Sequence, residues 1–151
     1  MTTAYFDCFA GASGDMILGA LIDTGLPLDA LSQALASLPL SGYRIETVPD
    51  KRGPLTGTRL SVVLDDGADH HHHRSLGDIL AIIGAGTLPA PVVERASRVF
   101  TRLAEAEAKV HGIDVQQVHF HEVGAADSIA DIVGSAVGWE AGWEAGGRDL
   151  G

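Results

Sequence analysis

Apolar residues recur along this chain with two periods, and each period predicts a different kind of element. Apolar residues spaced three and four apart predict helices over residues 16–24, 29–38, 75–84 and 91–112, and a last helix from residue 127 onward. Alternating apolar and polar residues predict strands over residues 43–48 and 58–64, with shorter extended segments over 3–9 and 118–123. We therefore expect an α+β (mixed α/β) fold, in which a small sheet is covered by about four to five helices.

The longest predicted helix carries the clearest packing stripe. Pro91 suits its first turn and Gly112 suits its end. Its apolar positions alternate four and three residues apart, and we expect them to face the core: Val92, Ala96, Val99, Leu103, Ala106 and Val110. At the start of the preceding helix, Ser75 and Asp78 have the spacing of a capping box.

The end of the sequence changes in character. Residues 139–146 repeat a Trp-Glu-Ala-Gly unit, and glycine is frequent there. Glycine weakens helices and strands because its backbone loses the most freedom on ordering. We therefore divide the chain into one domain, residues 1–138, and a flexible glycine-rich tail, residues 139–151.

Composition limits the classes of function. The 151 residues are 46% apolar and carry a net charge of −10, which fits one folded domain with a substantial core. A nucleic-acid surface would need clustered Lys and Arg, so we expect no nucleic-acid partner. The single cysteine, Cys8, excludes an intramolecular disulfide. Because no apolar stretch has the length of a membrane span and the first residues lack a signal-peptide pattern, we expect a cytoplasmic protein with no membrane partner.

Six of the seven histidines fall in two short clusters. The first cluster is a run of four in an acidic loop: His70, His71, His72 and His73. An engineered tag or a solvated polar loop would give the same run, but tags usually lie at a terminus and this run is internal. Imidazole is a common ligand of nickel, zinc and copper, so the run predicts metal capture or delivery.

The second cluster comprises His119, His121 and Glu122, with Phe120 between the histidines. Residues two apart share one face of an extended segment, so the two imidazoles would point together and Phe120 would point into the core. Two imidazoles supply half of a four-ligand metal site. Glu122 would add a third ligand or orient an imidazole. A purely polar surface is the alternative interpretation.

A strand-to-helix turn near the N-terminus suits an anion. Gly11, Ser13, Gly14 and Asp15 lie where the free N–H groups of a helix start would point at a phosphate. The turn is neither a Walker loop nor a G-x-G-x-x-G motif. Asp15 would alternatively stabilise only the first turn of the helix, or it would hold a metal ion together with Asp7.

Two further carboxylates, Asp127 and Asp131, lie four residues apart on the last predicted helix and therefore on one face. Asp127 suits the helix N-cap. Asp131 lies among apolar residues, where a carboxylate needs a cation or a hydrogen-bond donor. An arginine or a lysine would serve as well as a metal ion, and the sequence does not choose between them.

Three motifs, in this order, resemble one known family. They are residues 5–16, the histidine loop that ends at Arg74, and residues 118–134. The chain resembles the N-terminal part of the LarC family, which inserts nickel into pyridinium-3,5-bisthiocarboxylic acid mononucleotide, the precursor of the lactate racemase cofactor. The resemblance implies a cyclometallase that forms nickel–carbon and nickel–sulfur bonds and uses CTP with a divalent ion such as Mg²⁺ or Mn²⁺. It also implies that CTP binds a C-terminal domain, which we expect to act with this chain in cis or in trans.

Under this resemblance, we expect the chain to bind nickel, the mononucleotide precursor, or both, and to form a homo-oligomer. The four-histidine run would collect nickel, and the turn from Gly11 to Asp15 would hold the phosphate of the precursor. His119, His121 and Glu122 would form a fixed metal site, and further candidate metal ligands are Asp7, Asp127 and Asp131. Two alternatives stay open. One is a nickel store or chaperone without catalysis. The other is a domain that binds nucleotide phosphates through Mg²⁺ or Mn²⁺ on Asp7, Asp15, Asp127 and Asp131, with the histidines incidental.

Overall fold

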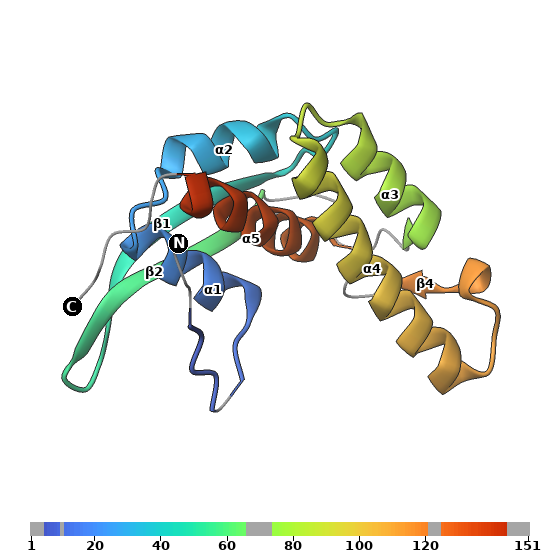
Figure 1. Ribbon diagram of the computed structural model, residues 1–151, viewed down its shortest axis with the longest axis horizontal. Helices are drawn as coiled ribbons and strands as arrows, with labels where there is room; N and C mark the ends of the chain where they lie inside the picture. Colours follow the sequence, from blue (N-terminus) through green and yellow to red (C-terminus); the bar gives the residue numbers. More distant parts are fainter. Residues whose placement is uncertain (1–4, 10, 66–73, 121–124, 145–151) are drawn as a thin grey trace.

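The computed structural model describes residues 5–9, 11–65, 74–120 and 125–144, and it confirms the α+β fold (Figure 1). In these ranges the helices are α1 (Gly14–Asp23), α2 (Leu28–Ala36), α3 (Leu76–Ala85), α4 (Ala90–His111) and α5 (Ala126–Glu144). The strands are β1 (Tyr43–Arg52), β2 (Leu55–Leu64), β3 (Arg74–Ser75) and β4 (His119–Phe120). A short 3-10 helix, η1 (Val115–Gln117), precedes β4.

The described strands form two separate antiparallel pairs. β1 and β2 make a long hairpin that extends from the pair Tyr43 and Leu64 to the pair Arg52 and Leu55. The hairpin is longer than the alternation of residues predicted, because Gly53 turns the chain with a positive φ of 59° and the strands stay paired up to that turn. β3 and β4 are only two residues long and pair with each other.

The strand expected over residues 3–9 is wrong for the part that is described. Residues 5–9 belong to neither sheet, and the side chains of Tyr5 and Phe9 are 86% and 94% exposed. Bulky apolar residues favour strands only where neighbouring strands or a core cover them. Phe6 instead stacks on Trp139 of α5, with the ring centroids 5.9 Å apart. This contact holds the N-terminal segment beside α5.

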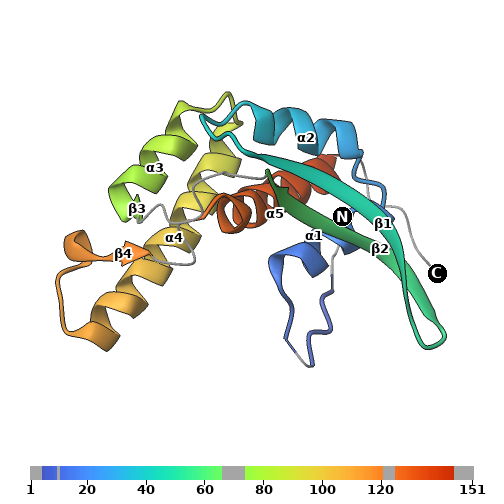
Figure 2. The same ribbon diagram turned by 180° about the vertical axis from the view of Figure 1, so that it is seen from behind.

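α5 is the central element of the fold. Figures 1 and 2 show it beside α1, α2 and α4, and it also contacts β2. Small residues permit this close packing. A Cβ added at Gly134 would lie 3.2 Å from side-chain carbons of Leu18 and Leu31, and one added at Gly138 would lie 2.7 Å from a methyl carbon of Leu21. The neighbouring helices therefore approach the backbone of α5 directly.

α1 packs equally closely on β2. Gly19 leaves no room for a side chain, because a methyl group there would overlap the carbonyl oxygen of Thr58. At the end of α1, the Asp23 carboxylate accepts hydrogen bonds from the N–H of Thr58 at 2.9 Å and from its hydroxyl at 2.6 Å. These contacts fix α1 on β2 and place its N-terminal end against α5.

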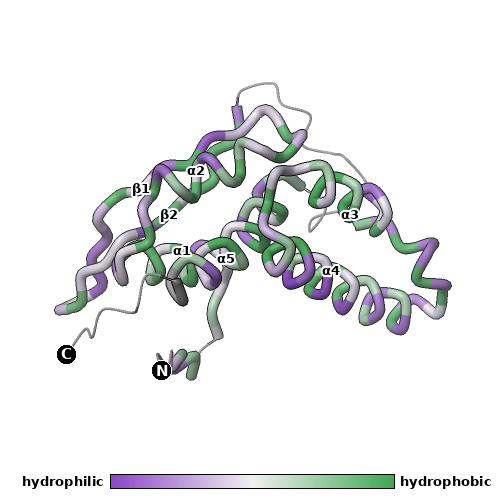
Figure 3. The backbone as a smooth tube through the Cα atoms, turned by 45° about the horizontal axis from the view of Figure 1, so that its top comes forward, coloured by the Kyte–Doolittle hydropathy of each residue, from purple (hydrophilic) through white to green (hydrophobic). Residues whose placement is uncertain are grey.

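The packing stripe predicted for the longest helix, α4, is partly wrong. Val92 and Ala96 are buried, but Val99, Leu103 and Val110 are 41%, 37% and 79% exposed. The buried residues instead follow one another at intervals of four: Val92, Ala96, Phe100, Ala104 and Ala108. Residues spaced four apart gradually change face along a helix, because one turn has about 3.6 residues. The buried face of α4 changes in this way because the helix contacts three elements, α3, α5 and η1. Figure 3 shows the alternation of apolar and polar positions along α4.

Two local predictions about helix ends are confirmed. Ser75 and Asp78 form a reciprocal capping box at the start of α3, and Gly112 ends α4 in the left-handed conformation with φ of 65°. α5 continues past residue 138, where we place the end of the domain, as far as Glu144. That boundary stays a prediction. Among the helices of the described ranges, none is both long and apolar enough to span a membrane.

Candidate functional site

Three carboxylates from two helices meet where α1 begins. Asp15 lies in the first turn of α1, Asp127 lies in the first turn of α5, and Asp131 follows one turn later. The helices meet here because Gly14 has no side chain. A Cβ at Gly14 would lie 2.5 Å from the Cβ of Asp131 and 2.8 Å from its Oδ2. We call Asp15, Asp127 and Asp131 the carboxylate cluster.

Asp131 is the unusual member of the cluster. Its Oδ1 atom is buried and accepts no hydrogen bond from the described residues. Burial, followed by the charges of Asp15 and Asp127, raises the pKa of Asp131 from its ordinary value of 3.8 to about 6. A carboxylate taken out of water normally has a cation or a donor beside it. The cluster therefore has an excess of negative charge and favours a proton or a metal ion.

The other two carboxylates each stabilise the start of a helix. The Oδ1 atom of Asp15 accepts hydrogen bonds from the hydroxyl of Ser13 and from the N–H of Met16, the latter at 2.9 Å. The Oδ1 atom of Asp127 accepts the N–H of Ser128 at 2.7 Å. α5 begins at Ala126, so Asp127 lies inside the first turn rather than at the N-cap. A negative charge is favourable at both places because it opposes the helix dipole.

The segment predicted to bind a phosphate, Gly11 to Asp15, leads into α1 without a preceding strand among the described residues, and its charge is unfavourable for a bare phosphate. Gly11 has a positive φ of 82°, and its N–H donates to the carbonyl of Cys8 at 3.0 Å, so that N–H is already bonded. Ser13 donates to Asp15, whose carboxylate lies at the helix start. An anion would therefore meet the carboxylate cluster, and a cation between them would remove the repulsion. Asp7 is exposed on the preceding segment and is not among the charges that raise the pKa of Asp131.

The second histidine cluster begins on β4. Phe120 is buried and packs edge-on against Phe100, with ring centroids 6.4 Å apart, while His119 is exposed. The prediction that Phe120 points into the core is thus confirmed. Ser75 lies opposite His119 across the strand pair, and hydrogen bonds from Ser75 lower the pKa of Asp78, with smaller contributions from His119 and Arg74. An acidic group beside His119 was not predicted as part of a site, because the capping box already explained Asp78.

The remaining predicted ligands lie outside the described residues: His70, His71, His72, His73, His121 and Glu122. The described residues on either side of them are nonetheless informative. Arg74, which follows the four-histidine run, pairs with Phe120, which precedes His121. Paired Cα atoms in an antiparallel ladder are about 5 Å apart. Both histidine segments are therefore attached to the fold at neighbouring points.

Within the described ranges, no group of three or more His, Cys, Asp or Glu side chains is arranged so that it could hold a metal ion. The carboxylate cluster by itself is therefore not a complete site. Its oxygen atoms can contribute to a metal site only together with further ligands, and their chemistry alone would suit a hard ion such as Mg²⁺ or Mn²⁺.

Comparison with known proteins identifies the class to which this fold and these motifs belong. The model of the nickel insertion protein family matches residues 4–142. A relative from Roseiflexus castenholzii, which carries the name of a nickel insertion protein, is 57% identical over 125 residues, or 83% of this chain and 31% of the relative. A similarly named relative from Citrifermentans bemidjiense is 53% identical over 129 residues, or 85% of this chain and 33% of the relative.

This chain belongs to the nickel insertion protein family. A further relative, from Desulfitobacterium hafniense, is named pyridinium-3,5-bisthiocarboxylic acid mononucleotide nickel insertion protein and is 49% identical over 129 residues, or 85% of this chain and 31% of the relative. The resemblance drawn from the motifs is thus confirmed. The chain spans about a third of the length of these curated relatives. No solved structure matches the chain.

Proposed function

We propose that this chain is the part of a nickel insertion protein that binds nickel and presents it to a pyridinium mononucleotide precursor. The observation that carries the proposal is the buried, unpaired Oδ1 atom of Asp131, in a cluster with Asp15 and Asp127. A divalent cation would neutralise this cluster and give the orphaned oxygen a partner. Nickel here is the substrate that is transferred, and not a resident cofactor.

The nickel ligands in this proposal come from both histidine segments and from the carboxylates. Imidazole nitrogen suits Ni²⁺ better than it suits Mg²⁺ or Ca²⁺, which prefer oxygen. The run of four, His70 to His73, collects the ion, and His119, His121 and Glu122 receive it beside Asp127 and Asp131. The pairing of Arg74 with Phe120 supports this order, because both segments are attached there. The chain between Phe120 and Ala125 spans at most about 18 Å. The segment with His119, His121 and Glu122 is therefore attached close to the start of α5, which carries Asp127 and Asp131.

The mononucleotide precursor is the proposed acceptor of the ion. Its phosphate would approach the turn formed by Gly11, Ser13 and Gly14 after a cation has neutralised Asp15 and its neighbours. Insertion itself, with CTP and Mg²⁺ or Mn²⁺, is assigned to the whole protein, because this chain spans only about a third of its relatives. Asp7 stays a candidate ligand that would approach with the N-terminal segment.

Two other functions are compatible with the same residues. A nickel store would bind several ions weakly through the four-histidine run and would not depend on Asp131. A domain that binds nucleotide phosphates through Mg²⁺ or Mn²⁺ would use Asp7, Asp15, Asp127 and Asp131, with the histidines incidental. The buried and unpaired state of Asp131 favours an ordered site over a store, and the two attached histidine segments favour nickel over manganese.

Calorimetric titration of the untagged chain with Ni²⁺, and separately with Mn²⁺, tests the proposal. We expect tight binding of about one nickel ion per chain, followed by a weaker phase with several ions. Replacing His119 and His121 with Ala, or Asp127 and Asp131 with Asn, should weaken the tight phase by at least about tenfold. His111→Ala and Asp29→Asn are matched controls, since both residues are exposed and lie away from the cluster.

Each alternative gives a different titration. Nickel binding in the weak phase alone, unchanged by Asp131→Asn, would identify a store. Manganese binding without a preference for nickel, unaffected by loss of the imidazoles, would indicate that the aspartates bind the metal ion and would support the nucleotide-phosphate alternative. Binding of the mononucleotide only when Ni²⁺ is present would support the proposed order of cation before phosphate.

A further inference from the structure

α4 carries an apolar stripe that the described fold leaves uncovered. Val99, Leu103 and Val110 are 41%, 37% and 79% exposed, and Ala106 between them is also exposed. The four residues are spaced four, three and four apart, as in the seam of packed helices. We call Val99, Leu103, Ala106 and Val110 the outer stripe. Its spacing predicted burial, yet the core lies along a different line of residues on the same helix.

A row of basic residues borders the outer stripe. Arg95, Arg102 and Lys109 recur at seven-residue intervals, which places them along one edge of the stripe. Arg95 pairs with Glu140 of α5 at 3.0 Å, and Arg102, whose side chain is 84% exposed, pairs with Glu105 on α4 at 3.4 Å. The side chain of Lys109 is exposed too. This edge is distinctive in a chain whose net charge is −10. A complementary surface would carry carboxylates beside an apolar stripe.

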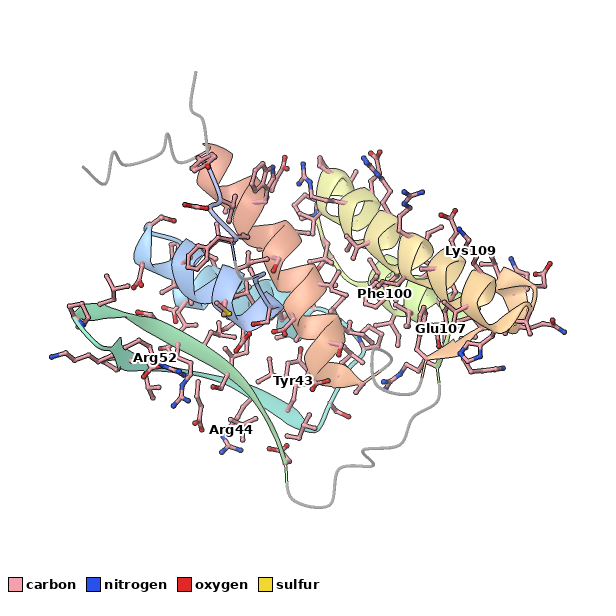
Figure 4. All side chains as sticks on the ribbon, turned by 90° about the horizontal axis from the view of Figure 1, so that it is seen from below. Tyr43, Arg44, Arg52, Phe100, Glu107 and Lys109 are labelled. Atoms are coloured by element: carbon pink, nitrogen blue, oxygen red, sulfur yellow. The ribbon has the colours of Figure 1, made fainter. Side chains whose placement is uncertain are left out.

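The domain itself closes the opposite edge of the stripe. Phe100, Ala104 and Ala108 lie there and are fully or almost fully buried against neighbouring elements. Figure 4 shows Phe100 directed inward from α4 and Lys109 at its outer surface. The basic row therefore lies on the edge of the stripe that is directed away from the core of the domain, where it can contact a covering helix.

We propose that the outer stripe of α4 is the docking surface for an amphipathic helix with an acidic flank, supplied by the part of the family's chain outside the matched third. The relatives are about three times as long as the matched region, so ample chain is available to cover the stripe. A second copy of this chain is a poorer occupant in an antiparallel arrangement. An antiparallel pairing of two α4 helices would place Arg102 and Lys109 against the same residues of the other copy, and like charges oppose that contact. The inference does not depend on nickel binding.

Hydroxyl-radical footprinting on a full-length chimera tests this surface. In the chimera, this chain replaces the matched 125 residues of the Roseiflexus castenholzii relative. Modification of Leu103 and Val110 should fall severalfold compared with the chain alone. Leu55 serves as the internal control, because its side chain is 73% exposed at the tip of the β1–β2 hairpin and should react equally in both proteins.

Variants separate docking from a general change in the fold. Val110→Glu should restore modification of Leu103 in the chimera, whereas Leu55→Glu should not. Arg102→Glu combined with Lys109→Glu should also restore modification of Leu103 at low salt. Arg44→Glu on β1 is the matched charge control. Equal modification of the stripe in both proteins would overturn the proposal. So would protection of the stripe in the chain alone together with a doubled mass in light scattering, because a second copy would then be the occupant. Both results are independent of the nickel titration, so either proposal can fail alone.

Discussion

The carboxylate cluster and the outer stripe of α4 depart in opposite directions from the usual distribution of side chains. In the cluster, an ionisable oxygen of Asp131 is buried without a partner among the described residues. On the stripe, Val110 is 79% exposed to water. Neither arrangement favours folding of the isolated domain. The comparison teaches that neither surface stabilises the isolated domain, so the stability of the fold comes from elsewhere.

The source of that stability lies between the two regions, in the close packing around α5. Gly134 and Gly138 bring α5 against leucines of α1 and α2, and Gly14 brings the start of α1 against Asp131. The tight packing that stabilises the domain is therefore also what forces the carboxylates together. Substitutions in the two regions should consequently have very different effects, and their comparison can be tested directly.

The largest difference is expected when the same large side chain is added at each place. Gly134→Leu should destabilise the protein by about 3 kcal/mol, because side-chain carbons of Leu18 and Leu31 already lie where its Cβ would be in tight contact. Ala106→Leu on the outer stripe should change the free energy of unfolding by less than about 0.5 kcal/mol. Urea denaturation measures both values. A comparable loss for Ala106→Leu would mean that the stripe is covered within this chain.

Charge in the cluster gives the next largest effect. The folded-state pKa of Asp131, about 6, lies above its ordinary value of 3.8, so its contribution to stability is present below about pH 4 and is lost as the pH rises through about 6. Asp131→Asn should remove this loss. The variant should be more stable than the parent protein well above pH 6, by about 1–2 kcal/mol because partial exposure screens the repulsion, and equally stable near pH 4.

Chemical denaturation over this pH range, without added metal, measures the effect of Asp131→Asn. Asp29→Asn, at an exposed position in α2, is the control and should leave the pH profile unchanged. A variant that is less stable than the parent protein at neutral pH would show that Asp131 already has a cationic partner. Added nickel should make the parent protein more stable than Asp131→Asn, since only the parent retains the full set of proposed ligands.

The sequence predicted the local features and missed the long-range ones. The helices, the strand pair, the Ser75–Asp78 capping box and the inward position of Phe120 all follow from patterns over a few residues, and all are confirmed. The meeting of Gly14 with Asp131 could not be predicted, because it depends on how α1 and α5 pack across more than 100 intervening residues.

Two errors have a common physical cause. The sequence predicts a strand that includes Phe9 and a core-facing stripe from Val99 to Val110, but both are exposed in the described structure. Periodicity identifies the face that needs covering, and it does not identify the partner that covers it. The same limit applies to the candidate site, where the sequence identifies a residue that needs a partner but not the partner itself. The apolar neighbours of Asp131 predict a carboxylate that needs a cation or a hydrogen-bond donor, and one of the alternative functions already grouped Asp15 with it.

A smaller effect is expected at the contact between α4 and α5. Arg95 and Glu140 form a partly buried ion pair at 3.0 Å, and a double-mutant cycle with Ala should give a coupling of about 0.5–1 kcal/mol. The more exposed pair of Arg44 and Glu46 on β1, at 2.8 Å, should give less. A coupling near zero for Arg95 and Glu140 would mean that the basic row does not contribute to holding α4 in place.

The smallest effect should come from Val110→Glu in the chain alone, and this smallness is itself informative. Val110 is 79% exposed, so a glutamate there loses little apolar burial, and the free energy of unfolding should change by no more than about 0.5 kcal/mol in urea denaturation. Removing an exposed apolar side chain should also raise solubility. Ala108→Glu, at a buried position two residues away, should by contrast unfold the end of α4. A large loss of stability from Val110→Glu would place the outer stripe inside the core, and the contrast between a binding face and a stabilising face of α4 would then disappear.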